Sequence, residues 1–270
     1  MRPNFKGMKS TKITIIGCGN LGQSILKGLL NQQDIQAESI TVTKRNTSDL
    51  LAYENQGVRV MSDNKEAIKT SNLIILALKP YRVLEVLKEI APDLNPQKQL
   101  VVSLATGISL YQLEKTISND TPVYRAMPNT AADVGEAVTC ICSNTKQDEA
   151  LVQQCFDSIG TSIRIEEALM DAATVLGACG IAFALRFMRS MVQGGIQIGF
   201  DSKTASTIVN QTVKGATELL LKGKQHPEFE IDKVTTPKGC TISGLNEMEH
   251  NGFSSALIKG IVTSHEAIES

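Results

Sequence analysis

The sequence has no tryptophan, few aromatic residues and almost no excess of charge of either sign. Aromatic residues make up 4% of the chain, and 27 Lys and Arg residues stand against 28 Asp and Glu residues. Without a basic surplus or a long block of one charge, the chain lacks the signature of proteins that bind nucleic acid or anionic membranes. We therefore expect a small-molecule ligand, with no nucleic-acid partner and no membrane partner.

The six cysteines form no Cys-x-x-Cys pair and have no histidine at metal-ligand spacing. This favours reduced thiols over disulfides, and we expect no metal site. The longest apolar run, residues 172–185, is bounded by Asp171 and Arg186 and is shorter than the ~20 residues of a membrane-spanning helix. The first ten residues lack the apolar core of a signal peptide. These absences predict a cytoplasmic protein with a short N-terminal extension, residues 1–10.

A chain of 270 residues with 42% hydrophobic content can bury a large core, and we expect two domains. In residues 11–167, short apolar runs alternate with helical patterning, which predicts an α/β domain with a Rossmann-type, doubly wound, mostly parallel sheet. After a first strand that starts near Lys12, strands are predicted at residues 39–43, 58–61, 72–78, 100–105, 123–126 and 137–142. Residues 168–270 are predicted to be all helical.

The glycine-rich segment IGCGNLG, residues 16–22, is the most informative motif of the first domain. Gly17, Gly19 and Gly22 match G-x-G-x-x-G between a predicted strand and a predicted helix. Missing side chains there allow a tight turn, close approach to a pyrophosphate and close helix packing, while the helix N-terminus attracts the phosphates. The motif predicts dinucleotide binding, and a glycine turn in an unrelated α/β protein is the alternative.

The end of the second predicted strand indicates which dinucleotide binds. Enzymes that use NAD usually carry a carboxylate there, whereas this chain has Lys44, Arg45, Asn46 and Thr47. Cations at this position suit the 2′-phosphate of NADP. We therefore expect NADP(H) as the preferred cofactor and NAD(H) as a possible one; a solvated loop would also be basic. In the same domain, Arg125 could be a plain surface charge, but its neighbours argue against that interpretation.

The second domain begins with a long, nearly all-apolar helix. Small residues within it, which allow close helix approach, are Ala172, Ala173, Gly177, Ala178 and Gly180. A helix apolar on all sides must be buried, so we expect it to pack against a second subunit as well as its own. Further helices are predicted at about residues 202–221 and on either side of Asn251 and Gly252. Between them, KVTTPKGCTISGL (residues 233–245) predicts a turn rich in hydroxyl groups.

Taken together, the motifs resemble one family, the pyrroline-5-carboxylate reductases. The resemblance runs from Ile13 to about Glu266 through segments that occur in the family's order and spacing. These segments are IGCGNLG, LALKP, SLATGI, YRAMPNTA, EEALMDAATVLGACGIAF, TVKGATELLLKGKQHP and KVTTPKGCTISGLNEMEHNGF. The resemblance implies a nicotinamide-binding domain, a helical dimerisation domain whose dimers sometimes stack into larger rings, and the last step of proline synthesis.

The resemblance also implies roles for individual residues. The carboxylate of the cyclic imino acid would be held by Thr236, Gly239 and Cys240, Thr241 would be the catalytic contact to the ring nitrogen, and Glu167 would be a polar contact at the edge of the site. The implied cofactor-binding residues are Gly17, Gly19, Asn20, Leu21, Arg45, Asn46, Asn64, Leu78, Lys79 and Ala105. Without the resemblance, Thr241 would be read as a helix N-cap.

Some residues depart from the family pattern. Residues 177–181, GACGI, stand where the family usually has S-G-S-G-P, and Cys240 replaces a threonine or alanine. Lys238 replaces a glycine, so a positive φ there would cost about 1 kcal/mol or more. Lys233 stands where some members have an uncharged polar residue.

Two other functions remain open from the sequence. One is a β-hydroxyacid-type or other imine dehydrogenase, although residues 171–191 contain no lysine, on which hydroxyacid dehydrogenases generally rely. The other is a non-catalytic NADP-binding redox sensor that would use Cys179 and Cys240.

Overall fold

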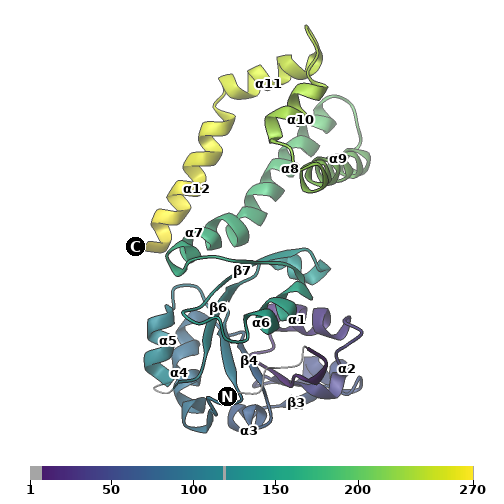
Figure 1. Ribbon diagram of the computed structural model, residues 1–270. Coiled ribbons are helices and arrows are strands. Elements are labelled where there is room, and N and C mark those ends of the chain that lie inside the picture. The colour runs from purple at the N-terminus through teal and green to yellow at the C-terminus, as the bar shows by residue number, and fades with distance from the viewer. Residues whose placement is uncertain (1–7, 118–119, 270) are drawn as a thin grey trace. The chain divides into compact units, whose positions relative to one another are not determined.

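The computed structural model describes residues 8–117 and 120–269 (Figure 1). It divides into two compact units, the first up to Ala178 and the second from Cys179 onward. The division lies later in the chain than the boundary predicted after residue 167, because Met170 packs into the core of the first unit. We describe each unit by itself.

The described part of the first unit contains one eight-stranded sheet with the order β3-β2-β1-β4-β5-β6-β7-β8. Its strands are β1 (Ile13–Ile16), β2 (Ile40–Thr43), β3 (Arg59–Met61), β4 (Leu73–Leu76), β5 (Leu100–Ser103), β6 (Val123–Met127), β7 (Ala137–Cys142) and β8 (Gly160–Arg164). All neighbouring strands are parallel except β6 and β7. The predicted doubly wound, mostly parallel sheet is confirmed. Strand β8 was not predicted, because this largely exposed edge strand lacks a continuous apolar run.

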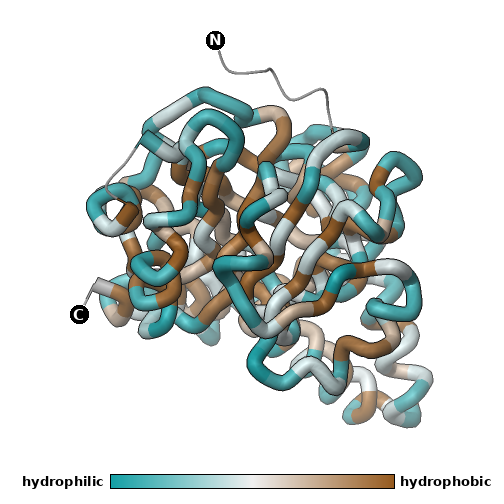
Figure 2. Tube along the Cα trace, turned by 90° about the horizontal axis from the view of Figure 1, so that it is seen from below, coloured by the Kyte–Doolittle hydropathy of each residue, from teal (hydrophilic) through white to brown (hydrophobic). Residues whose placement is uncertain are grey.

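Helices cover both faces of this sheet (Figure 1). They are α1 (Asn20–Leu30), α2 (Leu51–Glu54), α3 (Asn64–Ile68), α4 (Pro80–Ile90), α5 (Leu110–Ile117) and α6 (Glu149–Asp157). One core cluster includes Ile25 of α1 and Phe156 of α6, and the other includes Leu87 of α4 and Leu113 of α5. Because both faces are covered, β1, β2, β4 and β5 are buried at every residue. Figure 2 shows hydrophobic stretches inside this unit and hydrophilic turns around it.

The long apolar helix predicted at the start of the second domain is not a uniform α-helix. It begins with the 3-10 turn η6 (Glu167–Leu169), continues through α7 (Met170–Ala173) and the π-helical segment η7 (Thr174–Cys179), and ends with α8 (Gly180–Gln197). The amide Nδ2 of Asn129 donates to the carbonyl oxygen of Gly177 inside the π-helical segment, at 3.2 Å. A side chain that inserts into the helix ladder is a recognised cause of such a local change in winding.

The described part of the second unit is entirely helical, as predicted. After α8 it contains α9 (Ser202–Gly223), α10 (Pro227–Val234), α11 (Cys240–His250) and α12 (Phe253–Glu269). The Asp201 carboxylate caps α9 by accepting bonds from the backbone N–H groups of Lys203 and Thr204, at 3.0 and 3.1 Å. The Thr204 side chain, followed by these backbone N–H groups, lowers the pKa of Asp201 through hydrogen bonding. The break between α11 and α12 falls at Asn251 and Gly252, as expected, with Gly252 at φ 78°.

Little of the apolar surface of the second unit is buried within one chain. The buried cluster among its described residues consists of Val192, Ala205 and Val209. Large apolar side chains remain exposed on every helix from α8 to α12; they include Leu185, Ile196, Ile208, Leu219, Leu221, Phe229, Met248, Leu257 and Ile258. By length and composition alone, the helix at Glu167–Gln197 could cross a membrane. A helix that buries an apolar face against a second subunit passes the same test.

Candidate active site

A cavity of about 650 Å³ opens in the first unit at the carboxyl ends of the central strands. It lies where β1 is flanked by β2 on one side and β4 on the other, the point at which the strand order reverses. Open α/β sheets bind their ligands at this switch point. Its walls come from the turn after β1, the ends of β2 and β4, and the loop after β6, all within the first unit.

The glycine-rich turn forms the floor of this cavity. Gly17 has φ 89°, and a Cβ atom there would lie 2.5 Å from Leu78 Cδ2 and 2.7 Å from the Ala77 carbonyl oxygen. A Cβ atom on Gly22 would lie 2.9 Å from the Gly17 carbonyl oxygen, so this glycine allows α1 to pack closely. The N–H groups of Gly17 and Cys18 both donate to the Thr43 carbonyl oxygen, at 3.0 and 2.9 Å, and fix the turn against β2.

Gly19 has a different role from the other two glycines. A Cβ atom there would meet nothing within 4 Å, and Gly19 is the N-cap of α1 without a side-chain capping bond. The N–H groups of the first helical turn, including those of Asn20 and Leu21, have no acceptor within their own helix. Open space beside unpaired N–H groups at the positive end of a helix dipole suits a pyrophosphate.

Two cations follow the end of β2, and one of them is held in an ion pair. Lys44 forms an ion pair with Asp49, which also accepts a hydrogen bond from the Gln23 side chain, and the bond from Lys44 is the main cause of the lowered pKa of Asp49. Arg45 also lines the cavity and forms no ion pair within residues 8–117 and 120–269. Asn64 lies nearby and is held by the Thr43 hydroxyl, which donates to its Oδ1 at 2.7 Å.

Eight of the ten predicted cofactor residues line this one cavity. They are Gly17, Gly19, Asn20, Leu21, Arg45, Asn64, Leu78 and Lys79. Asn46 and Ala105 are not among the lining residues. The Asn46 side chain instead accepts a bond from the Ser48 N–H at 3.0 Å, and Ala105 is buried, with its N–H donating to Ser103 Oγ at 3.3 Å.

The cavity also contains residues that sequence reasoning missed. Tyr81 and Arg82 directly follow the Lys79-Pro80 turn, and Tyr81 is 81% exposed. Asn129 and Asp133 come from the loop after β6 and from η5 (Thr130–Val134), and Asp133 accepts a bond from the Ser24 hydroxyl. The signal that could have found them is their position immediately after the ends of parallel strands.

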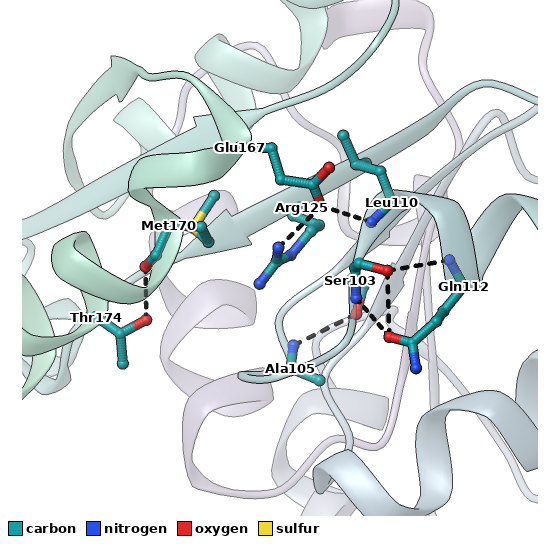
Figure 3. A network of polar contacts seen from close by, with 9 residues as sticks. Ser103, Ala105, Leu110, Gln112, Arg125, Glu167, Met170 and Thr174 are labelled. Atoms are coloured by element: carbon teal, nitrogen blue, oxygen red, sulfur yellow. Dashed lines mark hydrogen bonds and ion pairs between the residues drawn. The ribbon is translucent and has the colours of Figure 1, made fainter. Parts of the chain in front are cut away.

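A second polar group lies in the first unit at the start of α5. Arg125 lies on β6 with 5% of its surface exposed, so it is not a plain surface charge. Its NH1 atom lies 3.0 Å from Glu167 Oε1, and the same oxygen accepts the Leu110 N–H at 2.6 Å. Figure 3 shows the Glu167 carboxylate between the Arg125 guanidinium and the Leu110 backbone.

The hydroxyl-rich turn of the second unit has the geometry of a tight cap at the start of α11. Its first part is closed by a bond from the Gly239 N–H to the Thr236 carbonyl oxygen, at 2.9 Å. Lys238 has φ 59°, the strained conformation that its replacement of a glycine suggested. A Cβ atom on Gly239 would lie 2.5 Å from Thr236 Oγ1 and 3.0 Å from the Thr236 carbonyl oxygen, so a side chain there would force the turn to shift. Helix α11 begins at Cys240, which is exposed, and continues with the half-buried Thr241.

This turn leaves specific N–H groups for an anion. The Gly239 N–H is already hydrogen-bonded within the turn, whereas Cys240 and Thr241 occupy the first two positions of α11. N–H groups at these positions have no acceptor within the helix. The start of α11 can therefore bind a carboxylate through Cys240 and Thr241.

The thiols of the first unit are poorly suited to redox chemistry. Burial raises the pKa of Cys18 and of Cys155 to about 12 and the pKa of Cys142 to about 11. All six cysteines are free, and Cys240 is the one exposed to solvent.

Within residues 8–117 and 120–269, no group of three His, Cys, Asp or Glu side chains is placed to hold a metal ion.

Comparison with family models gives two matches, one in the N-terminal part of the chain and one in the C-terminal part. Residues 12–107 match the family described as NADP oxidoreductase, coenzyme F420-dependent. Residues 167–270 match the family described as pyrroline-5-carboxylate reductase dimerisation.

Known proteins resemble the chain over nearly its whole length. It is 40% identical to pyrroline-5-carboxylate reductase 1 of Dictyostelium discoideum over 94% of this chain, although the chain spans only 48% of that protein. It is 38% identical to pyrroline-5-carboxylate reductase 2 of the same organism, over 96% of this chain and 93% of that protein. The crystal structure of Plasmodium falciparum pyrroline carboxylate reductase with NADP bound is 28% identical, with a TM-score of 0.86 over 97% of this chain and 98% of that one.

Proposed function

The chain belongs to the pyrroline-5-carboxylate reductase family, and we propose that it reduces the ring C=N bond of pyrroline-5-carboxylate to give L-proline, with NADPH as electron donor. The observation that carries this proposal is the 38% identity to a pyrroline-5-carboxylate reductase over 96% of this chain and 93% of that protein. The match includes both the nucleotide cavity and the hydroxyl-rich turn.

The residues of the cavity fit a dinucleotide phosphate. Gly19 leaves a space that a side chain would fill, beside the N-terminus of α1, and the pyrophosphate would be held there by the Asn20 and Leu21 N–H groups. Arg45, which forms no ion pair among the described residues, would bind the 2′-phosphate. The Thr43 hydroxyl orients Asn64. The structural relative with NADP bound supports the same cofactor. NADPH would supply the hydride, and NADH remains a possible donor.

The residues at the start of α11 would bind the imino acid. We assign its carboxylate to the N–H groups of Cys240 and Thr241 and to the Thr236 hydroxyl, with Gly239 allowing the close turn. The Thr241 hydroxyl would hydrogen-bond the ring nitrogen. The reduction adds one hydride to the ring carbon and one proton to nitrogen. Because a threonine hydroxyl is a weak acid, Thr241 would orient the nitrogen and water would supply the proton.

The exposed apolar faces of the second unit support assembly. The dimerisation-family match over residues 167–270 indicates a homo-oligomer that acts on a small molecule. We propose a homodimer in which helices α8 to α12 bury their exposed apolar side chains against the partner, and dimers that can stack into a larger ring. Burial in this dimer would also explain why the helical run Glu167–Gln197 is apolar, without a membrane. We place the assembly in the cytoplasm.

The proposal is tested by following NADPH absorbance when the purified protein is given pyrroline-5-carboxylate. We expect rapid NADPH oxidation with formation of proline, slower oxidation of NADH, and a separate rate for the six-membered imine in parallel wells. If the protein binds NADPH but consumes none with either imine, the proposed activity is wrong. A non-catalytic NADP-binding module would then be the better description.

A further inference from the structure

Arg125 is a buried cation whose location the cofactor cavity does not explain. It lies on β6 with 6% of its side chain exposed and does not line that cavity. Its Nε atom is buried and has no hydrogen-bond partner among the residues that the structure describes. A buried guanidinium with an unsatisfied N–H group contributes little to stability, since an apolar residue of similar size often does as well. The location of Arg125 therefore calls for another reason.

The partner of Arg125 joins two segments that are distant in sequence. Glu167 Oε1 accepts both the Arg125 NH1 group at 3.0 Å and the Leu110 N–H at 2.6 Å. Leu110 is the first residue of α5, and Glu167 is the first residue of the helical run that extends to Gln197. A single carboxylate oxygen thus ties β6 to the beginnings of two helices (Figure 3).

The segment that this contact anchors leads directly into the cofactor cavity. Residues 104–109 connect β5 to α5, and Leu104 at their start lines the cavity. Gly107 within this connection has φ 73°, so the turn has a defined, glycine-dependent shape. Fixing the Leu110 N–H therefore fixes the far end of a turn whose near end contacts the cavity. The Glu167 side chain itself is 36% exposed, and the bonds from Arg125 and Leu110 both use Oε1, so Oε2 is open to a ligand.

We propose that Arg125 is a positioning residue that holds the Glu167 carboxylate, and through it the turn at residues 104–110, in the geometry needed to reduce the imine. The inference rests on the proposed reductase function. Arg125 itself does not line the cofactor cavity. Its effect passes through the charge and orientation of Glu167, because the guanidinium bond is charge-assisted on both sides.

The test compares four variants with the wild-type chain: Arg125→Met, Arg125→Lys, Glu167→Gln and the double variant Arg125→Met with Glu167→Gln. Arg164→Met is the matched control, since Arg164, on β8 of the same sheet, also pairs with a glutamate: its NH1 lies 2.7 Å from Oε2 of Glu149 on α6. Turnover with the imine, KM for the imine, Kd for NADPH and the melting temperature are measured for each variant.

We expect Arg125→Met and Glu167→Gln each to lower kcat/KM for the imine roughly 10- to 100-fold, the range of a lost charge-assisted bond. The Kd for NADPH should stay within about twofold, because the phosphate-binding turn and Arg45 are untouched. The double variant should lose no more than the worse single variant, since both act through one contact. Arg125→Lys should recover part of the activity, and Arg164→Met should keep it.

Three outcomes would overturn the inference. Arg125→Met could turn over like an active wild type; NADPH binding could weaken in parallel with turnover; or Arg164→Met could lose as much activity as Arg125→Met, which would indicate a structural role alone. If Arg125→Met does not fold, Glu167→Gln and Arg125→Lys give the same comparison. An inactive wild-type protein would instead contradict the proposed reductase function.

Discussion

The two units of this chain use their apolar residues in opposite ways. The first unit buries its central strands on both faces, within two large clusters of apolar side chains. In the second unit, the cluster buried among the described residues has three members, while leucines such as Leu219 and Leu257 are exposed. The first unit can be stable on its own core, whereas the second exposes apolar surface that we propose a partner subunit buries. The proposed site divides in a similar way: the proposed nucleotide residues lie in the first unit, and the proposed contacts to the imine, apart from Glu167, lie in the second.

The largest expected effect comes from placing a charge on the exposed apolar surface of the second unit. Leu219 is 55% exposed, and Leu219→Glu would bury an unpaired carboxylate in the proposed subunit interface at a cost of several kcal/mol. We expect dissociation of the oligomer and loss of activity, measured by size-exclusion chromatography with light scattering. Leu51 of the first unit is 57% exposed and gives the control, because Leu51→Glu should leave the assembly intact. Equal behaviour of the two variants would remove the contrast between the units.

Thr241→Ala addresses the imine residues of the second unit. Loss of the hydroxyl that we propose orients the ring nitrogen should reduce turnover roughly 100-fold, the size of a typical positioning or proton-transfer contribution. The Kd for NADPH should remain unchanged, since the nucleotide residues belong to the first unit. Steady-state kinetics and fluorescence titration with NADPH measure the two effects. Unchanged turnover would contradict the role given to Thr241.

Arg45→Ala addresses the nucleotide residues of the first unit. Removing the Arg45 guanidinium should weaken NADPH binding about tenfold and leave NADH binding nearly unchanged, because NADH has no 2′-phosphate. Titration with each nucleotide gives the two dissociation constants. Arg59→Ala is the matched control, since Arg59 lies on β3 outside the lining of the cavity. A similar loss for NADH and NADPH would show that Arg45 does not read the 2′-phosphate.

The smallest expected effect is at Lys238. Its φ of 59° favours glycine, so Lys238→Gly should raise the free energy of unfolding by about 1 kcal/mol or less, after the entropic cost of glycine. Denaturant unfolding at fixed protein concentration measures the change, and Lys238→Ala is the control that removes the charge while keeping the strain. A decrease in stability for the glycine variant would mean that the Lys238 side chain has contacts that outweigh the strain.

The features that sequence analysis found are those with a local signal. Apolar runs bounded by turns gave the first seven strands, and the spacing of Gly17, Gly19 and Gly22 gave the nucleotide turn. The strain at Lys238 was anticipated because the motif has a glycine there.

The features it missed depend on contacts between distant residues. The Arg125–Glu167 pair joins positions 42 residues apart, and no pattern near either residue indicates the other. In the π-helical segment at Thr174–Cys179, the Gly177 carbonyl oxygen accepts a hydrogen bond from the Asn129 side chain, which belongs to a loop far earlier in the chain. Strand β8 forms because β7 offers it a parallel edge, although its own sequence has no continuous apolar run. Propensity alone therefore could not find them.

The three-residue core of Val192, Ala205 and Val209 has a consequence for how this protein responds to its own abundance. When association buries the surface that a fold lacks, folding becomes partly a second-order process, and dilution acts as a mild denaturant. The melting temperature is then a function of concentration rather than a constant of the chain. The rate of synthesis in the cell would then set both the amount of enzyme and the fraction of the molecules that are folded.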